Sequence, residues 1–557
     1  MTVATKTRLV GVVGESAPRS DAPPKTQGTF AYASDLARPG MLHGATVRSP
    51  HPRARIMRVD TGVARAMPGV FAVLTSADLP TREKFGLMKL DQPPLATDVV
   101  RYVGEPVAIV AAEDAERARL AAKAIVVEYA PLEAITDPVR ALQPDAPSLH
   151  DGGNVIEDVR VAHGDVDAGA DVVVAGEYEI GMQDQAPLGP EAGLAIPDPD
   201  GGVTLHIATQ WLHEDLRQIA ACLGLPESKV RLVLAGVGGA FGAREDVTLQ
   251  IHLCLLALAT KKPVRMVYGR EESFYGHVHR HPARLWYAHG ARRDGTLVFV
   301  RASIVLDGGG YASASPAVVA NAACFGAGPY RVPNAVIHAV GAYTNNPPTG
   351  AMRGFGAVQS CFAYEAQMDK LAAALRMDPV ELRARNALAD GDQIVTSQTV
   401  EGSEPVANVI RRCAALPAPA AAEHDDPVAI VAAEDAERAR LAAKAIVVEY
   451  APLEAITDPV RALQPDAPSL HDGGNVIEDV RVVHGDVVAG ADVVVEGEYE
   501  IGMQDQAPLG PEAGLAIPDP DGGVTLHIAT QWLHEDLRQI AACLGLPESK
   551  VRLVLAA

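Results

Sequence analysis

Cysteine is scarce in this chain, and its placement excludes several kinds of metal and redox site. Only six cysteines occur among 557 residues, and no two of them form a Cys-x-x-Cys pair. Zinc ribbons and thiolate-bound iron–sulfur clusters need closely spaced cysteines. We therefore expect no such site within this chain, so that any electrons it releases would pass to another subunit.

Positive charge and long apolar runs are also lacking. The formal net charge is −22 and no run of Lys or Arg occurs, which argues against nucleic acid as a partner. No apolar stretch approaches the roughly 20 residues that span a bilayer, and residues 1–14 lack the apolar centre of a secretory signal. We expect a cytoplasmic protein without a membrane partner.

The composition that remains is that of a folded protein with mixed secondary structure. Hydrophobic residues make up 48% of the chain and charged residues 21%, and 557 residues suffice for several packed units. Residues 107–112 and 124–129 have strand patterns around a helix at 114–123, which predicts a β-α-β unit. Residues 297–306 predict another strand. Further helices are predicted at 210–223, 247–259, 358–375 and from 378 onward, with Asp114, Thr209 and Asp378 as N-caps and Gly224 as a stop. The predicted fold class is α+β.

A long internal repeat dominates the organisation of the chain. Residues 427–557 repeat residues 106–236 at an offset of 321 positions. The four differences are Ala162 to Val483, Asp167 to Val488, Ala175 to Glu496 and Gly236 to Ala557. Solenoid repeats are shorter and more numerous, so the near-identity indicates a recent duplication or an error in assembling the sequence.

One glycine-rich stretch is a candidate ligand loop. It reads Gly238-Gly-Ala-Phe-Gly-Ala-Arg-Glu245, and such small residues let the backbone approach a ligand closely. It matches neither a dinucleotide fingerprint nor a phosphate-binding P-loop. Alone, the motif is equally typical of a plain turn between a strand and a helix.

A second loop repeats this chemistry. Residues 345–359 contain Ala351-Met-Arg-Gly-Phe-Gly356 ahead of a predicted helix. Arg353 could bind an anion and Phe355 could stack on a flat ring, although a tight loop with a core Phe is the simpler alternative. With Ala208-Thr-Gln210 also directly ahead of a helix, the three features form a combination.

Three alternating histidines are a weaker candidate. His277, His279 and His281 would share one face of an extended segment. No carboxylate lies at a ligand-like spacing, so we expect solvated histidines in a loop or edge strand and not a metal site.

Taken together, the motifs resemble the large, molybdenum-cofactor-binding subunit of the xanthine dehydrogenase and aldehyde oxidase family. The resemblance rests on Gly-Gly-Ala-Phe-Gly followed by an acidic residue, and then on Ala-Met-Arg-Gly-Phe-Gly. Val13-Gly-Glu-Ser, Tyr32-Ala-Ser-Asp and Val103-Gly-Glu-Pro-Val-Ala support it, and it covers about residues 10–390. The motifs are most similar to those of bacterial xanthine dehydrogenase molybdenum subunits.

The resemblance implies a domain organisation. After an N-terminal segment (1–26), we expect an α/β hammerhead domain at 27–138 and the first part of a molybdopterin-binding domain at 139–390. A linker (391–426) and the near-identical duplicate (427–557) follow.

It also implies an activity and partners. Such enzymes hydroxylate a purine-like heterocycle or an aldehyde with oxygen from water, using molybdenum held by a molybdopterin, here expected in a dinucleotide form. Electrons pass to iron–sulfur clusters and FAD, which we expect on partner subunits in a dimer of heterotrimers. Carbon monoxide oxidation is disfavoured, because its Cys-bearing loop would replace Arg353-Gly-Phe355.

Site residues follow by position in the motifs. Cofactor-binding residues would be Gln210, Gly239, Ala240, Phe241, Gly242 and Arg353, with no side chain of this chain ligating the molybdenum directly. Glu245 would be a catalytic residue, as the carboxylate on the substrate side. Phe355 and Asn321 would bind the substrate, with Phe355 sandwiching its planar ring.

Departures from the family pattern favour an alternative. Ala243 replaces a usual Gly, and Asn321 stands where animal purine-oxidising enzymes carry an Arg. The duplicate occupies the place of the second cofactor-binding half and lacks the Gly-x-Gly-Glu segment that supplies the general-base Glu. The chain as written would then be a non-catalytic, rearranged remnant that is inactive and binds molybdopterin poorly.

Overall fold

The computed structural model describes residues 19, 21–165, 169–402, 406–416, 429–449, 451, 453, 455–456, 458–480 and 514–555. The chain divides into two compact units, residues 1–426 and 427–557. Among the described residues, no helix combines the length and apolar character that crossing a membrane requires.

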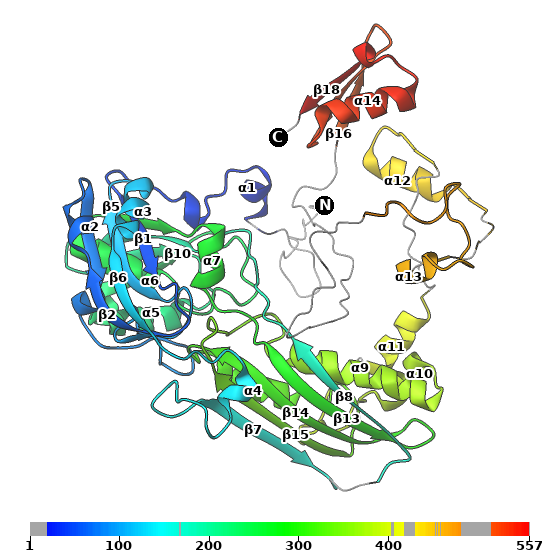
Figure 1. Ribbon diagram of the computed structural model, residues 1–557, viewed down its shortest axis with the longest axis horizontal. Coiled ribbons are helices and arrows are strands. Elements are labelled where there is room, and N and C mark those ends of the chain that lie inside the picture. Colours follow the sequence, from blue (N-terminus) through cyan, green and yellow to red (C-terminus); the bar gives the residue numbers. More distant parts are fainter. Residues whose placement is uncertain are drawn as a thin grey trace, which may run out of the picture. The chain divides into compact units, whose positions relative to one another are not determined.

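A seven-stranded mixed sheet is the first layer of the first unit (Figure 1). Its order, β11-β10-β9-β12-β1-β5-β3, joins early and late parts of the chain, because β1 pairs in parallel with β12 and places Leu42 opposite Val264. The strands are β1 (Leu42–Arg48), β3 (Val70–Thr75), β5 (Pro106–Ala112), β9 (Ala192–Pro197), β10 (Val203–Ile207), β11 (Val230–Leu234) and β12 (Val264–Val267).

Helix α6 (Gln250–Thr260) fills the core against this sheet. Residues 250–257 are all buried and the helix contacts β3, β5, β9, β10 and β12, as expected for a helix that is apolar nearly all round. The amphipathic helix α5 (Leu212–Leu223) packs against α6 and β11. It ends, as predicted, at Gly224, which adopts a left-handed φ of 64°.

A smaller sheet shows where the predicted β-α-β unit is wrong. Helix α3 (Ala115–Lys123) does connect β5 to β6 (Val126–Pro131), but β6 pairs with β2 (Ala54–Asp60) in the separate sheet β4-β2-β6. Strand β5 is buried along its whole length and β6 is not. The two strands therefore suit different layers. The remaining elements of this region are β4 (Val99–Val100) and α2 (Gly62–Ala66).

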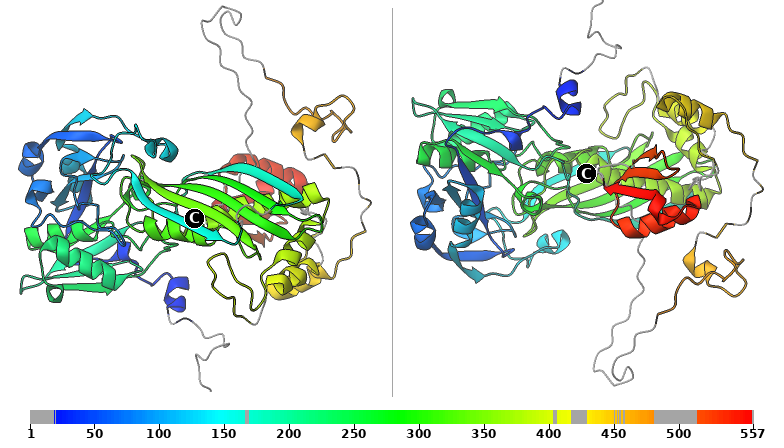
Figure 2. Two further views of the ribbon diagram at one scale, coloured as in Figure 1. Left: turned by 90° about the horizontal axis from the view of Figure 1, so that it is seen from below. Right: turned by 90° about the horizontal axis from the view of Figure 1, so that it is seen from above.

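A five-stranded sheet forms the other half of the first unit, in the order β7-β15-β14-β13-β8 (Figures 1 and 2). Its strands are β7 (Val155–His163), β8 (Val172–Ile180), β13 (Ala283–Ala291), β14 (Leu297–Gly309) and β15 (Asn334–Tyr343). Helices α8 (Ser315–Cys324) and α9 (Ala357–Leu375) contact each other and the strands, and share their core. The predicted strand at 297–306 and helix at 358–375 are confirmed.

Two of the three predicted helix N-caps are confirmed by the structure. Asp114 and Asp378 cap α3 and α10 (Pro379–Asn386) by accepting from backbone N–H groups, as predicted. Thr209 does not cap α5, which begins at Leu212. The shorter elements are α1 (Ala22–Thr26), α4 (Pro138–Ala141), α7 (Arg270–Gly276), α11 (Val406–Ala414) and the 3₁₀ turns η1 (Ala33–Asp35), η2 (Ser76–Asp78) and η3 (Glu227–Lys229).

Within its described residues, the second unit reproduces some but not all elements of the fold that its twin sequence adopts. The strand order β16-β17-β18 and helix α14 reproduce β9-β10-β11 and α5. Residues 429–433, identical to part of β5, form no strand. The elements are α12 (Ala436–Lys444), α13 (Pro459–Ala462), β16 (Gly514–Pro518), β17 (Val524–Ile528), α14 (Leu533–Leu544), η4 (Glu548–Lys550) and β18 (Val551–Leu555).

Missing neighbours explain this difference, because β5 pairs with β1 and β3 in the first unit and the duplicated sequence includes neither strand. They also explain why β16 is more exposed than β9. In the first unit, β9 is flanked by β12 and covered by α6, and the duplicated sequence includes neither element. Leu194 of β9 is accordingly 1% exposed, whereas its counterpart Leu515 is 59% exposed. Tertiary context, and not local sequence, decides burial here.

This pair of leucines gives a matched test of the two units. We expect Leu194→Ala to destabilise the first unit by about 2–5 kcal/mol, the usual result of emptying a buried leucine site. Leu515→Ala should change stability by less than about 0.5 kcal/mol, because the side chain is largely in water already. Differential scanning calorimetry of the full chain measures both; equal shifts would contradict the assigned burial.

Candidate active site

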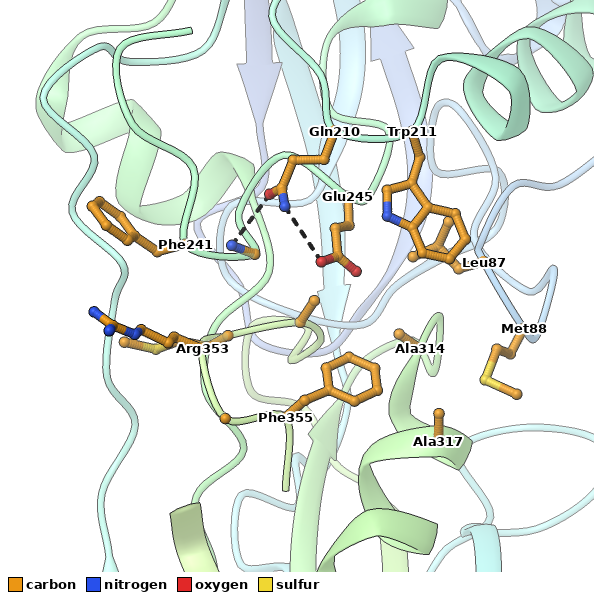
Figure 3. A pocket seen from close by; sticks show the side chains of 14 residues that line it. Leu87, Met88, Gln210, Trp211, Phe241, Glu245, Ala314, Ala317, Arg353 and Phe355 are labelled. Atoms are coloured by element: carbon orange, nitrogen blue, oxygen red, sulfur yellow. Dashed lines mark hydrogen bonds between the residues drawn. The ribbon is translucent and has the colours of Figure 1, made fainter. Parts of the chain in front are cut away.

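A cavity of about 530 Å³ brings together residues from distant parts of the first unit (Figure 3). Most of its wall is apolar, and Gln210, Glu245 and Arg353 supply the charged or amide groups, as is usual for small-molecule sites. The lining residues are Leu87, Met88, Gln210, Trp211, Phe241, Gly242, Glu245, Ala314, Ala317, Ala351, Met352, Arg353, Gly354 and Phe355.

The two predicted glycine-containing loops meet backbone to backbone at this cavity. The Arg353 N–H donates to the Phe241 carbonyl at 3.0 Å. Gly242 has a φ of 104°, and a Cβ at that position would lie 2.3 Å from the Ala351 carbonyl oxygen. Only glycine permits this approach. Ala243, by contrast, has no positive φ, so the alanine is tolerated there.

Gln210 joins the segment before α5 to the glycine loop. Its Oε1 accepts from the backbone N–H groups of Gly242 and Arg244 at 3.2 and 3.3 Å, and its Nε2 donates to Glu245 Oε1 at 3.4 Å. Its own N–H donates to the Arg244 carbonyl at 2.8 Å. These bonds fix the amide at the cavity wall with Nε2 beside the carboxylate (Figure 3).

Glu245 is the carboxylate that faces the cavity. It is half-buried and makes no ion pair with another described residue, and this desolvation raises its pKa. The neighbouring Asp246 is buried behind it and accepts from the Ser313 hydroxyl. Burial and nearby carboxylates raise the pKa of Asp246 to about 7. Glu245 therefore presents a partly desolvated carboxyl group to a ligand in the cavity.

Phe355 extends into the cavity from a strained backbone. Its φ is 46°, a left-handed value that is rare for an aromatic residue. Asn321 Nδ2 donates to its carbonyl at 3.1 Å and so supports the loop from outside the cavity. Arg353, in the same loop, has an exposed side chain without an ion-pair partner among the described residues.

Six of the nine predicted site residues line the cavity, and three do not. Gln210, Phe241, Gly242, Glu245, Arg353 and Phe355 are lining residues, whereas Gly239, Ala240 and Asn321 lie directly behind or beside them. Five further side chains line the cavity opposite these loops and were not predicted from the sequence: Leu87, Met88, Trp211, Ala314 and Ala317. Only Trp211 carried a signal, as a rare aromatic beside Gln210.

A buried network of charged groups anchors the glycine loop. Arg244 and Glu191 form an ion pair in which both side chains are buried, and Arg244 Nη2 donates to the Gly189 carbonyl at 2.6 Å. His277 Nδ1 lies 3.0 Å from Glu191 Oε1, and its Nε2 lies 3.0 Å from Asp184 Oδ2.

The prediction of solvated histidines is therefore wrong. His277, His279 and His281 are each 4% exposed or less. The carboxylates beside His277 come from a segment about 90 residues earlier, which no local spacing reveals. Burial alone would lower the pKa of His277 and raise that of Glu191. Their mutual contacts, with those of Asp184 and Arg244, outweigh it and give pKa values of about 9 and about 2.

Comparisons with known proteins identify the family of this chain. The family model described as "Molybdopterin cofactor-binding domain" matches residues 149–387 and 470–556, and the model "Aldehyde oxidase and xanthine dehydrogenase, a/b hammerhead domain" matches residues 27–133. The chain therefore belongs to the xanthine dehydrogenase and aldehyde oxidase family, as a molybdopterin-binding member with a hammerhead domain.

Individual relatives differ in how much of them the chain covers. It is 40% identical over 395 residues to the nicotinate dehydrogenase large molybdopterin subunit of Eubacterium barkeri, covering 70% of this chain and 93% of that protein. It is 40% identical to a probable xanthine dehydrogenase subunit of Bacillus subtilis, covering 66% of this chain but 50% of that one. The aldehyde oxidoreductase of Desulfovibrio gigas has a similar structure, with a TM-score of 0.67, 25% identity, and 96% of this chain and 55% of that one covered. The chain thus spans about half the length of several relatives.

The contact between the loops can be tested at Gly242. We expect Gly242→Ala to lower the melting temperature of the first unit clearly more than Gly153→Ala does. Both glycines have left-handed φ values, so both substitutions carry a backbone cost of about 1–2 kcal/mol. Only at Gly242 would the added methyl group also meet backbone, since nothing lies within 4 Å at Gly153. Equal melting temperatures for the two variants would mean that the loops do not meet this closely.

The anchoring network predicts a pH dependence of stability. A raised pKa of about 9 against an ordinary 6.5 means that the stability contributed by His277 is full below pH 6.5 and is lost as pH rises through about 9. We expect His277→Gln to be less stable than wild type at pH 6, and the difference to shrink toward pH 9.5. Urea titrations with a chelator present measure this difference; a constant difference across the range would contradict the assigned ion pairs.

Proposed function

We propose that this chain forms one wall of the molybdenum-cofactor site and substrate pocket of a molybdenum hydroxylase. The proposed substrate is a planar, purine-like nitrogen heterocycle or an aldehyde. The observation that carries the proposal is the meeting of the 238–245 loop, Gln210 and the 351–355 loop around one cavity. The family supports the reaction class, and the cavity supports the substrate class.

The residues around the cavity fit a molybdopterin. The backbone packs so closely at Gly242 that no side chain fits there. Gln210 places its Nε2 beside the glycine loop. Arg353, which has no ion-pair partner among the described residues, suits anionic groups of the cofactor. We assign cofactor binding to Gln210, residues 239–242 and Arg353. When bound, this group would supply the two-electron oxidation with oxygen from water, which side chains alone cannot perform.

The substrate side of the cavity uses different groups. Phe355 and Trp211 offer aromatic surfaces for a flat ring. Glu245 would accept a hydrogen bond from a ring N–H when ionised, or donate one to a ring nitrogen or carbonyl when protonated. Its partial burial raises its pKa, which favours the protonated form relative to an exposed carboxyl group. We assign Asn321 the task of holding the Phe355 backbone in position, because its side chain bonds to that carbonyl.

We further propose that other polypeptide segments complete the assembly. A second segment, in this or another chain, would close the open side of the cavity, and an iron–sulfur subunit and an FAD subunit would receive the electrons. Relatives that are named as subunits of dehydrogenases support this arrangement. A dinucleotide form of the cofactor, a dimer of heterotrimers and a cytoplasmic location remain part of this proposal.

The non-catalytic alternative has less support. A relative named as a molybdopterin subunit is covered over 93% of its length by 395 aligned residues. The matched part of this chain therefore corresponds to nearly the whole length of that relative.

The test uses the assembly purified from its source, with molybdenum measured by mass spectrometry and turnover followed with an artificial electron acceptor. The substrates would be nicotinate, xanthine, quinoline and benzaldehyde. We expect Glu245→Gln to retain molybdenum but to lose roughly 10- to 150-fold in kcat/KM, about the effect of one hydrogen bond to a charged group. Gln210→Ala should instead lose molybdenum.

The duplicate provides the control. Gln531 is the sequence counterpart of Gln210 and does not line the cavity, so Gln531→Ala should leave molybdenum content and turnover at wild-type values. Absence of molybdenum from the wild-type assembly, or equal effects at Gln210 and Gln531, would refute the proposal.

A further inference from the structure

Asp184, His277 and His279 converge on one point outside the cavity. Asp184 Oδ2 lies 3.0 Å from His277 Nε2 and 3.1 Å from His279 Nε2, and the three atoms all lie within 4.8 Å of one another. The histidine side chains are 0% and 5% exposed and that of Asp184 is 16% exposed. Two imidazoles and one carboxylate are a common donor set for divalent transition metals.

The orientation of both rings suits metal ligands. In each ring Nε2 faces Asp184, while Nδ1 faces an acceptor, Glu191 Oε1 at 3.0 Å for His277 and the Pro348 carbonyl at 3.3 Å for His279. Metal-ligating histidines almost always donate their other ring N–H to a carboxylate or carbonyl in this way. Protons on both Nδ1 atoms would leave two Nε2 lone pairs directed at the same place.

Hydrogen bonds leave several buried polar atoms of this cluster without a partner. Asp184 Oδ2 and both ring nitrogens of His277 are buried and make no hydrogen bond of acceptable angle, despite separations of 3.0 Å. His279 Nε2 also lies 2.9 Å from the Phe274 carbonyl oxygen. This contact requires a proton on Nε2, and metal binding at Nε2 would replace it. A metal ion would replace the proton that His277 otherwise holds between Asp184 and Glu191, since ligating histidines are neutral. The two carboxylates and the Arg244 cation then leave a net negative charge, which favours a bound cation.

From these contacts we propose that Asp184, His277 and His279 form a binding site for a divalent first-row transition metal ion, with zinc the preferred ion. Zinc holds nitrogen and carboxylate ligands at about 2.0–2.2 Å, which places neighbouring ligand atoms about 3.4 Å apart. Two of the three separations, 3.0 and 3.1 Å, are already close to that value, and the third is no more than 4.8 Å. Magnesium and calcium prefer all-oxygen ligands and are disfavoured.

Such an ion would join the 184–191 segment to the 277–279 segment. Glu191 continues the connection to Arg244 in the glycine loop, so the ion would stabilise the support of the cavity without touching the cavity itself. The inference needs neither molybdenum nor turnover and is independent of the proposed function.

The experiment titrates chelator-stripped full-length protein with zinc chloride, using calorimetry and zinc analysis after dialysis. We expect one zinc per chain and a higher melting temperature, with no effect of magnesium chloride at the same concentration. His279→Gln and Asp184→Asn should each weaken zinc binding by more than about 100-fold, since even changes to outer partners cost about 10- to 100-fold.

Two variants serve as matched controls. Asp505→Asn alters the counterpart of Asp184 in the duplicate, which has no counterpart of His277 or His279. His338→Gln removes the surface histidine that pairs with Asp158 at 2.9 Å. Both should bind zinc as wild type does.

Zinc X-ray absorption of the wild-type protein keeps the proposal testable if the variants fail to fold. It should show two imidazoles, oxygen and no sulfur. Sulfur ligands, a wild-type chain without stoichiometric zinc, or wild-type affinity in folded His279→Gln and Asp184→Asn variants would each overturn the proposal.

Discussion

The meeting of two loops, residues 238–245 and 351–355, is the contact on which the candidate site depends. It works only because Gly242 has no side chain where the Ala351 carbonyl passes. Gln210 then bonds to the backbone of one loop, and Asn321 supports the other through Phe355. These backbone contacts hold the two loops in fixed positions, which preorganises this part of the cavity wall for a large, polar cofactor.

A second constraint on the site is a charged side chain that is buried away from water. Arg244 belongs to the glycine loop, and its guanidinium is held by Glu191, which in turn contacts His277. Breaking such a buried pair is far more costly than breaking a surface pair. The loop that lines the cavity is therefore held in place by side chains that lie outside the cavity. The histidine cluster is part of this group of supporting side chains.

Local sequence accounts for much of the fold, but not for its long-range pairings. The caps at Asp114, Asp378 and Gly224 and the two glycine loops were predictable, because each depends on a few adjacent residues. The burial of His277 was not, since its carboxylate partners lie far away in sequence. The duplicate makes the same point within one molecule: residues 108–112 lie in a buried strand, and the identical residues 429–433 form none. Roles of individual site residues, such as Asn321, stay predictions that rest on the family resemblance.

The central claim is that a molybdenum cofactor binds where these loops meet. The most direct measurement is the anomalous scattering of a crystal of the purified assembly, recorded on both sides of the molybdenum absorption edge. The account predicts a molybdenum peak in the cavity, close to Gln210, Gly242 and Glu245. A fully occupied peak elsewhere, or an assembly that turns over heterocycles without molybdenum at this cavity, would contradict it.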